Sequence, residues 1–199
     1  MDTSYSKAET LTGALLAPLD AARGVALVVG FSLLTALAAQ IAIPVPFTPV
    51  PITGQVFAVL LTGALLGPRL GALAMIAYLF EGASGLPFFY GGRGGAAHLF
   101  SLTAGYLWAY PLAAFVTGYL AERGWDRRYL PATLAMALGS AVILLGGWFG
   151  LLAFMSPAQA FMQGVVPFVV GDLIKIALAA AVLPTGWLLL RRRSPRDDV

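Results

Sequence analysis

Residues 164–190, GVVPFVVGDLIKIALAAAVLPTGWLLL, decide what kind of protein this is. The run exceeds the roughly 20 apolar residues that a helix needs to cross a membrane. Only Asp172 and Lys175, near its middle, carry charge. The sequence therefore predicts a membrane-spanning helix that holds one charge of each sign.

The composition of the whole chain agrees with a membrane protein. Of 199 residues, 59% are apolar and 11% charged, and the mean hydropathy is +0.85, whereas soluble domains average about 25% charged residues. The net charge of +3 is expected to reflect how basic residues distribute across a membrane, so nucleic acid is not predicted as a partner. Cysteine is absent and His98 is the only histidine, which excludes disulfides and multi-histidine metal sites.

Five further apolar stretches precede residues 164–190, which makes six predicted spans. Gly67-Pro68-Arg69 is a turn signal that separates the second stretch from the third, so we interpret these as two short spans rather than one. The chain is thus predicted to be a single all-α membrane domain over residues 1–199. The spans are expected at 24–43, 52–67, 70–80, 98–121, 130–154 and 164–190.

The basic residues predict the orientation, because cytoplasmic loops carry an excess of Lys and Arg. With both termini in the cytoplasm, ten of the twelve Lys and Arg residues lie inside, Arg93 lies outside and Lys175 lies within a span. Residues 1–23 then form a cytoplasmic N-terminal segment and residues 191–199 a basic cytoplasmic tail. The ten are Lys7, Arg23, Arg69, Arg123, Arg127, Arg128, Arg191, Arg192, Arg193 and Arg196.

Asp172 and Lys175 are the first candidates for a binding site. A charge at the centre of a bilayer costs from about 2.5 to more than 10 kcal/mol, so such a residue normally faces a cavity and has a partner. At positions i and i+3 the two lie on one helix face and can pair. Either they neutralise each other as an internal ion pair, or they offer an acceptor and a donor to a polar ligand that enters from outside.

Two segments that face outward carry further candidates. Arg93, within GGRGG at 91–95, has a planar guanidinium that suits an incoming carboxylate, although this loop could also be a flexible linker with interfacial aromatic residues. Thr53 and Gln55 follow a proline-rich segment into the second span. The Thr53 hydroxyl can bond to its own helix backbone, but the Gln55 amide needs partners inside a membrane.

Two remaining features concern packing. Tyr106, about two turns into the fourth predicted span, is expected to pack or to line a pocket, whereas His98 is expected at the membrane interface. Ala22, Ala26 and Gly30 form a face of small residues on the first span, which would let another helix approach closely. That helix could belong to this chain or to a partner.

Several motifs follow one another in a distinctive order along the chain. They are IPVPFTPVPITGQ at 43–55, LLTGALLGPRLG at 60–71, GLPFF at 85–89, GGRGG at 91–95 and PFVVGDLIK at 167–175. Together with Tyr78, this set strongly resembles the BioY family, the biotin-specific S components of energy-coupling factor (ECF) transporters.

The resemblance implies a six-helix S component that binds biotin from outside, needs no cofactor and is not an enzyme. In that family a transmembrane coupling (T) subunit and two ATP-binding subunits complete the transporter in the bacterial cytoplasmic membrane. We expect Ala22, Ala26 and Gly30 to be the face that meets the coupling subunit.

The resemblance also implies which residues bind the ligand, since the family's pocket matches Arg93, Asp172 and Lys175 here. Our hypothesis is that Asp172 accepts from the ureido N–H groups of biotin, Lys175 donates to the ureido oxygen, and Arg93 lies nearer the carboxylate. Four aromatic residues would cover the apolar ring, and polar or glycine residues would complete the site. These are Phe88, Phe89, Tyr90 and Tyr106, and then Thr53, Gln55, Gly91 and Gly92.

Three other interpretations fit parts of the sequence. The first is an S component for a different vitamin, because the pocket rather than the fold determines the ligand. The second is an intramembrane hydrolase that uses a serine with His98, which the absence of a G-x-S-x-G motif disfavours. The third is a transporter that works alone, which the lack of evident inverted halves disfavours.

Overall fold

The structure is a computed structural model that describes residues 10–16 and 20–193, with side chains as far as residue 190. Lys7, Arg196 and the rest of the two predicted cytoplasmic ends beyond those ranges lie outside the described residues. The α-helices are α1 (Leu11–Leu16), α2 (Ala21–Gln40), α3 (Gln55–Ala83), α4 (Ala104–Glu122), α5 (Tyr129–Leu151), α6 (Pro157–Gly164) and α7 (Val166–Arg193). Short 3-10 helices cover Tyr90–Gly92 (η1), Ala96–Phe100 (η2) and Trp125–Arg127 (η3), and β1 (Ala42–Ile43) pairs antiparallel with β2 (Ile52–Thr53).

Helix α3 consists of two halves that fold back on each other at Gly67. The φ of Gly67 is +81°, a backbone conformation that glycine adopts without strain, and Pro68 then starts the second half. In one straight helix Gln55 and Tyr78 would stand about 35 Å apart. Instead the Gln55 amide donates to the Tyr78 hydroxyl at 2.6 Å. The predicted break at Gly67-Pro68-Arg69 is therefore confirmed.

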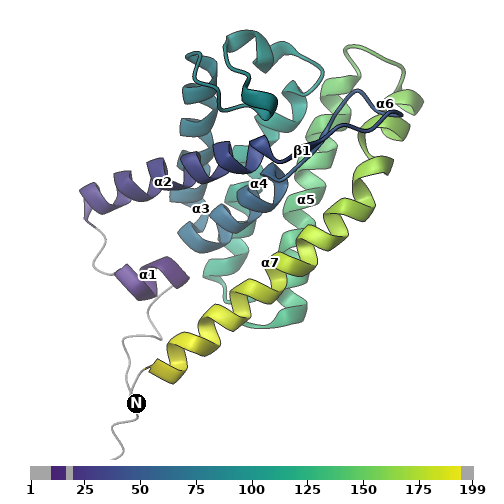
Figure 1. The fold of residues 1–199 in the computed structure, drawn as a ribbon. Helices are drawn as coiled ribbons and strands as arrows, with labels where there is room; N and C mark the ends of the chain where they lie inside the picture. Colours follow the sequence, from purple (N-terminus) through teal and green to yellow (C-terminus); the bar gives the residue numbers. More distant parts are fainter. Residues whose placement is uncertain (1–9, 17–19, 194–199) are drawn as a thin grey trace, which may run out of the picture.

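The predicted orientation places residues 44–51, 81–95 and 155–163 outside, and these three segments gather at one end of the molecule. The Gln40 side chain, at the end of α2, accepts from the backbone N–H of Gly92 at 2.9 Å and donates to the carbonyl of Phe89 at 3.4 Å. The Thr48 hydroxyl donates to the carbonyl of Gln163 at 2.7 Å. In Figure 1 the β1–β2 hairpin runs across this end from α2 to α6. This end is called the outer end below.

The opposite end is held by contacts between η3 and the last turns of α7. The Trp187 indole N–H donates to the Asp126 carboxylate at 2.5 Å, and the Arg127 guanidinium lies 4.7 Å from the Trp187 ring centroid. Burial raises the pKa of Asp126 to about 6, although the Trp187 bond and the charge of Arg127 act against this. This end, which includes α1 in Figure 1, is called the inner end.

Apart from the small hairpin, the regular structure is helical, and its long apolar helices are those of a membrane protein. Four stretches within the described residues are long and apolar enough to cross a membrane: α2, α3, α5 and the continuous run from Pro157 to Leu190 through α6 and α7. The other long helix, α4, begins at Ala104 rather than at His98 as predicted. The reason is local: the Ser101 hydroxyl donates to the His98 carbonyl at 2.8 Å and lies 3.1 Å from the Thr103 hydroxyl, which favours a turn over a helix.

Candidate functional site

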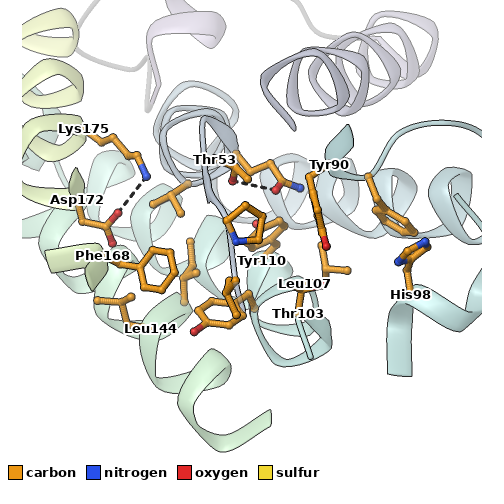
Figure 2. Close-up of a pocket in the computed structure, with 17 residues that line it drawn as sticks. Thr53, Tyr90, His98, Thr103, Leu107, Tyr110, Leu144, Phe168, Asp172 and Lys175 are labelled. Carbon is orange, nitrogen blue, oxygen red and sulfur yellow. Dashed lines mark hydrogen bonds and ion pairs between the residues drawn. The ribbon is translucent and has the colours of Figure 1, made fainter. Parts of the chain in front are cut away.

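A cavity lies near the outer end, among α3, α4, α5 and α7, with the proline-rich segment and the loop before α4 as its cover (Figure 2). Its empty volume, including the part open to solvent, is about 600 Å³. Most of its wall is apolar or aromatic. The lining residues are Val50, Pro51, Thr53, Gln55, Val56, Phe89, Tyr90, His98, Thr103, Tyr106, Leu107, Tyr110, Ile143, Leu144, Phe168, Asp172 and Lys175.

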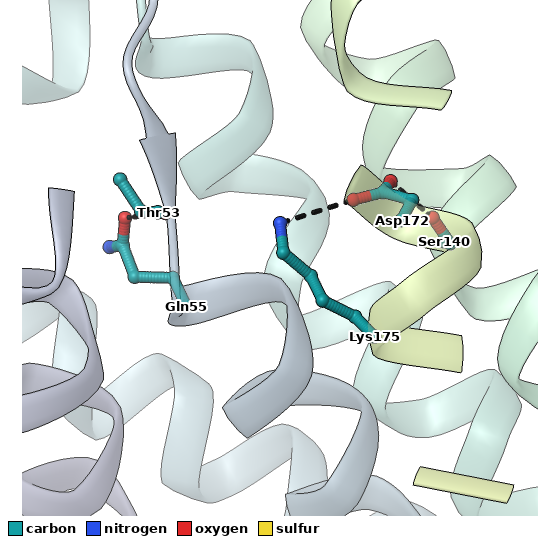
Figure 3. A network of polar contacts seen from close by, with 5 residues as sticks. All are labelled: Thr53, Gln55, Ser140, Asp172 and Lys175. Atoms are coloured by element: carbon teal, nitrogen blue, oxygen red, sulfur yellow. Dashed lines mark hydrogen bonds and ion pairs between the residues drawn. The ribbon is translucent and has the colours of Figure 1, made fainter. Parts of the chain in front are cut away.

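One side of the cavity is formed by an ion pair with a third partner (Figure 3). Lys175 Nζ lies 3.2 Å from Asp172 Oδ1, one helical turn away, and Ser140 on α5 donates to Asp172 Oδ2 at 2.6 Å. Asp172 is 3% exposed and Ser140 2%. The carboxylate therefore has one fixed donor for each oxygen, and both oxygens retain capacity for a further donor.

A second network of hydrogen bonds begins at the start of α3. The Thr53 hydroxyl donates to Gln55 Oε1 at 2.9 Å, the Gln55 amide donates to the Tyr78 hydroxyl, and Tyr78 donates to the carbonyl of Phe88 at 3.1 Å. Gln55 and Tyr78 are both buried. The predicted need of the Gln55 amide for partners is met inside the protein, and the network ties both halves of α3 to the outer loop.

Aromatic side chains form the wall between these polar groups. The Tyr106 hydroxyl donates to the carbonyl of Gly164 at 2.6 Å, and its ring lies 6.0 Å from that of Phe168. Phe89 packs edge-on against Tyr78 and against His98. Any Cβ at Gly147 would overlap the Tyr106 ring, so the small residue on α5 fixes where this ring can lie.

The ends of the cavity differ in character. Figure 2 shows Asp172 and Lys175 on one side, and Tyr90 and His98 on the opposite side, with Thr53 between them. An elongated ligand could therefore place one polar end against the ion pair on α7 and the other end beneath the loop that carries Tyr90.

Seven of the eleven predicted ligand-binding residues line the cavity together. The other four do not line it, and of these Phe88 accepts from the Tyr78 hydroxyl through its backbone carbonyl. Arg93 is exposed, donates from Nη1 to the Tyr90 hydroxyl at 2.7 Å, and stacks 4.8 Å from the Tyr90 ring centroid. Gly91 and Gly92 are exposed in η1, both with positive φ. The seven that line the cavity are Thr53, Gln55, Phe89, Tyr90, Tyr106, Asp172 and Lys175.

Several site residues were not predicted. Ser140 contacts Asp172 from another helix, and no feature of the sequence pairs the two. His98, expected at the interface, lines the cavity beside Phe89. Tyr110, which the sequence leaves open as either an interfacial residue or a pocket wall, lies one turn from Tyr106 on α4 and lines the cavity.

The small-residue face on α2 lies at the surface. Ala22, Ala26 and Gly30 are all exposed, and a Cβ added at Gly30 would meet nothing within 4 Å. Packing against another helix of this chain, one of the two alternatives for this face, does not occur among the described residues. They also contain no cluster of three or more His, Cys, Asp or Glu side chains suited to a metal ion.

Comparison with known proteins shows which family the chain matches. Residues 7–192 match the model of the BioY family. The chain is 43% identical over 161 residues to a protein from Pyrococcus horikoshii named probable biotin transporter BioY, an alignment that covers 81% of this chain and 94% of the relative. It is 41% identical to the biotin transporter BioY of Thermotoga maritima, over 70% of this chain and 82% of the relative.

The fold is shared with a solved structure. That structure, the 2.1 Å crystal structure of the S-component for biotin from an ECF-type ABC transporter, superposes with a TM-score of 0.76. The match covers 87% of this chain and 93% of the other, at 24% sequence identity. The S-component fold expected from the sequence is therefore confirmed.

Proposed function

The chain belongs to the BioY family, and from this membership we propose that it is the biotin-binding S component of an ECF-type vitamin transporter. Its task is to bind biotin at the outer end and to hold it for a transport step that other chains energise. The observation that carries the proposal is the Asp172–Lys175 pair, which is held in an apolar helix and lines a cavity whose wall is otherwise largely apolar and aromatic.

The chemistry of biotin suits the two sides of this cavity. Its ureido ring has two N–H donors and one carbonyl acceptor. Asp172 can accept from a ureido N–H while Ser140 and Lys175 hold it in place, and Lys175, 15% exposed at its side chain, can donate to the ureido oxygen. The rings of Tyr106 and Phe168 then lie where the apolar part of the ligand would pack.

The carboxylate end of biotin would lie toward Tyr90 and His98 (Figure 2). Arg93 does not line the cavity itself, but it is hydrogen-bonded to Tyr90, which does. We assign Arg93 to this end of the site, where its positive charge would attract the carboxylate across the Tyr90 side chain. Gly91 and Gly92, with φ of +67° and +70°, give the loop a conformation that other residues rarely adopt.

We place the protein in the cytoplasmic membrane with six membrane-crossing segments and both termini in the cytoplasm. The two halves of α3 count as two of the six, and Arg69, Arg123, Arg127 and Arg128 all lie at the inner end, as positive charge on the cytoplasmic side requires. The partners would be a transmembrane coupling subunit and two ATP-binding subunits. The exposed face of Ala22, Ala26 and Gly30 is the surface we assign to the coupling subunit.

Equilibrium binding of labelled biotin to the purified chain tests the proposal. We expect saturable binding at one site and an increase in thermal stability, about 2.7 kcal/mol when free biotin is 100 times its dissociation constant. Thiamine and riboflavin, vitamins that lack the fused ureido and thiophane rings of biotin, serve as comparison ligands in the same assay. Stabilisation by one of them in place of biotin would establish an S component for a different vitamin.

A further inference from the structure

A second hollow lies at the inner end, on the side of the molecule away from the biotin site. It is lined by Arg123, Gly124, Trp125, Arg127, Arg128, Pro131 and Leu134, and its volume is about 1220 Å³ including the open part. These residues, called the basic hollow, come from the loop between α4 and α5, from η3 and from the first turns of α5. The proposed biotin site uses none of them.

Two arginines of the basic hollow, Arg123 and Arg128, are available to a ligand of opposite charge. Arg123 stacks on Tyr119, with 3.5 Å from its guanidinium carbon to the ring centroid, and both Arg123 and Arg128 are exposed. Within the described part of the chain, neither of these two forms an ion pair. The neighbouring acids, Glu122 and Asp126, do not line the hollow, and Asp126 is buried against Trp187.

The hollow continues into an apolar surface on α5. Pro131 and Leu134 on α5 line the hollow. Leu138 and Leu145, four and eleven residues after Leu134, lie on the same side of this helix. Leu134, Leu138 and Leu145 are 49%, 49% and 52% exposed, so an apolar strip runs from the arginines toward the outer end. The surface therefore has a basic region next to an apolar strip, which matches the charged headgroup and the apolar acyl chain of an anionic phospholipid.

From this arrangement we infer that the basic hollow binds the phosphate of an anionic phospholipid in the cytoplasmic leaflet, with an acyl chain along Leu134 and Leu138. Guanidinium groups pair with phosphate oxygens through two parallel N–H bonds, and basic pockets between helices on the cytoplasmic side suit anionic headgroups. A free phosphate would use the arginines but leave the apolar strip without a role. The inference uses the proposed orientation but is independent of what the outer cavity binds.

Native mass spectrometry of the full chain, released from nanodiscs, tests the inference. The nanodiscs contain phosphatidylglycerol and phosphatidylcholine with identical acyl chains. We expect the wild-type chain to retain phosphatidylglycerol selectively. The variant Arg123→Gln/Arg128→Gln should lose about fivefold in retention for each arginine, which corresponds to about 1 kcal/mol per basic residue.

Arg69→Gln is the matched control, because Arg69 is also an exposed arginine at the inner end but does not line the hollow. Its lipid retention should equal that of the wild type. An equal loss in this control would overturn the inference, since it would mean a general effect of surface charge. Retention of phosphatidylcholine equal to that of phosphatidylglycerol by the unmodified chain would also overturn it, and this measurement stands even if the double variant does not fold.

Two further arms complete the test. Inorganic phosphate at 10 mM should not displace the lipid, and full displacement would assign the hollow to free phosphate instead. Biotin binding is measured on each preparation and should be unchanged in all three chains. A preparation that retains the lipid but binds no biotin would contradict the proposed function and leave this inference standing.

Discussion

Two buried carboxylates, Asp172 near the outer end and Asp126 at the inner end, are held in different ways. Both are nearly inaccessible, 3% and 1% exposed, and Asp172 belongs to α7 while Asp126 packs against it. Asp172 has Lys175 and Ser140, one on each oxygen. Among the described residues, Asp126 receives only the indole N–H of Trp187 from another element, and burial raises its pKa to about 6.

The difference shows that Asp172 is arranged to bind a ligand, whereas Asp126 is arranged to hold two elements together. Burying a charge is costly unless it is paired and hydrogen-bonded. Asp172 meets that condition and also borders a cavity, so its remaining acceptor capacity is open to a ligand. Asp126 meets it only in part and borders no cavity among those described, so its carboxylate joins two elements at a cost in stability.

Removing the ammonium of the outer pair should have the largest effect. Lys175→Met leaves Asp172 without its ion-pair partner and removes the proposed donor to the ureido oxygen. Loss of one member of a buried, hydrogen-bonded charge pair costs about 2–5 kcal/mol in binding, so we expect biotin affinity to fall by roughly 100-fold in an equilibrium binding assay. Unchanged affinity in detergent would remove Lys175 from the site.

The double variant Asp172→Asn/Lys175→Met is the control for that experiment. It removes both charges, so the protein should insert and melt more like the wild type than the single variant does. Biotin binding should still be lost, because neither the charged acceptor nor the donor remains. Recovery of binding in the double variant would show that the pair has only a structural role.

Ser140 should have the next largest effect if it positions Asp172 for the ligand. Ser140→Ala removes a hydrogen bond to a charged group, which is typically worth about 1.5–3 kcal/mol of stability, so we expect a lower melting temperature. Because Asp172 Oδ2 is then no longer fixed, we also expect biotin affinity to fall about tenfold. Ser140→Thr keeps the hydroxyl and should recover part of the loss. A lower melting temperature with unchanged affinity would mean that Ser140 only supports packing.

Changing Asp126 should increase stability at neutral pH. A carboxyl whose pKa is higher in the folded than in the unfolded protein binds its proton more tightly when folded, so stability rises as the pH falls through about 6 toward 4. Asp126→Asn keeps an oxygen for Trp187 but carries no charge. We expect it to stabilise the protein by about 1–2 kcal/mol at pH 7.5, within the upper limit of roughly 3 kcal/mol that this pKa allows.

Thermal unfolding of both chains in one detergent between pH 4 and pH 8 measures this effect. The gap between their melting temperatures should be widest above pH 7 and should close below pH 5, because all other titrating groups are common to both chains. A gap that is constant with pH would contradict the raised pKa, and a less stable variant would show that the charge of Asp126 is favourable.

The parts of the fold and site that the sequence predicted are those determined by local chemistry. The return of α3 was predictable because Gly67 and Pro68 together define a turn at one place in the chain. Asp172 and Lys175 were predictable because charge inside an apolar run requires a partner, and the spacing of three residues provides it.

The parts that the sequence did not predict depend on contacts between distant elements. A serine in a membrane helix usually bonds to its own backbone, so the pairing of Ser140 with a carboxylate 32 residues away has no sequence signal. His98 lines the cavity because η2 turns the chain before α4 begins, whereas an unbroken helix from His98 was expected. The position of Arg93 follows from the glycines around it, whose positive φ values no pattern specifies.

Arg93 should have the smallest effect, because it contacts the outer cavity only through Tyr90. Arg93→Ala removes an exposed charge, and exposed ion pairs are worth about 0–1 kcal/mol, so we expect a loss of at most about fivefold in biotin affinity. The loss should be larger for biotin than for its carboxamide, and it should shrink at high salt, if the guanidinium attracts the carboxylate.

Tyr90→Phe, which removes the hydroxyl that Arg93 contacts but keeps the ring in the wall, should reproduce a part of the loss in affinity. Equal losses for biotin and the carboxamide would place the carboxylate elsewhere, and a loss comparable to that of Lys175→Met would mean that the loop moves Arg93 into the cavity when ligand binds.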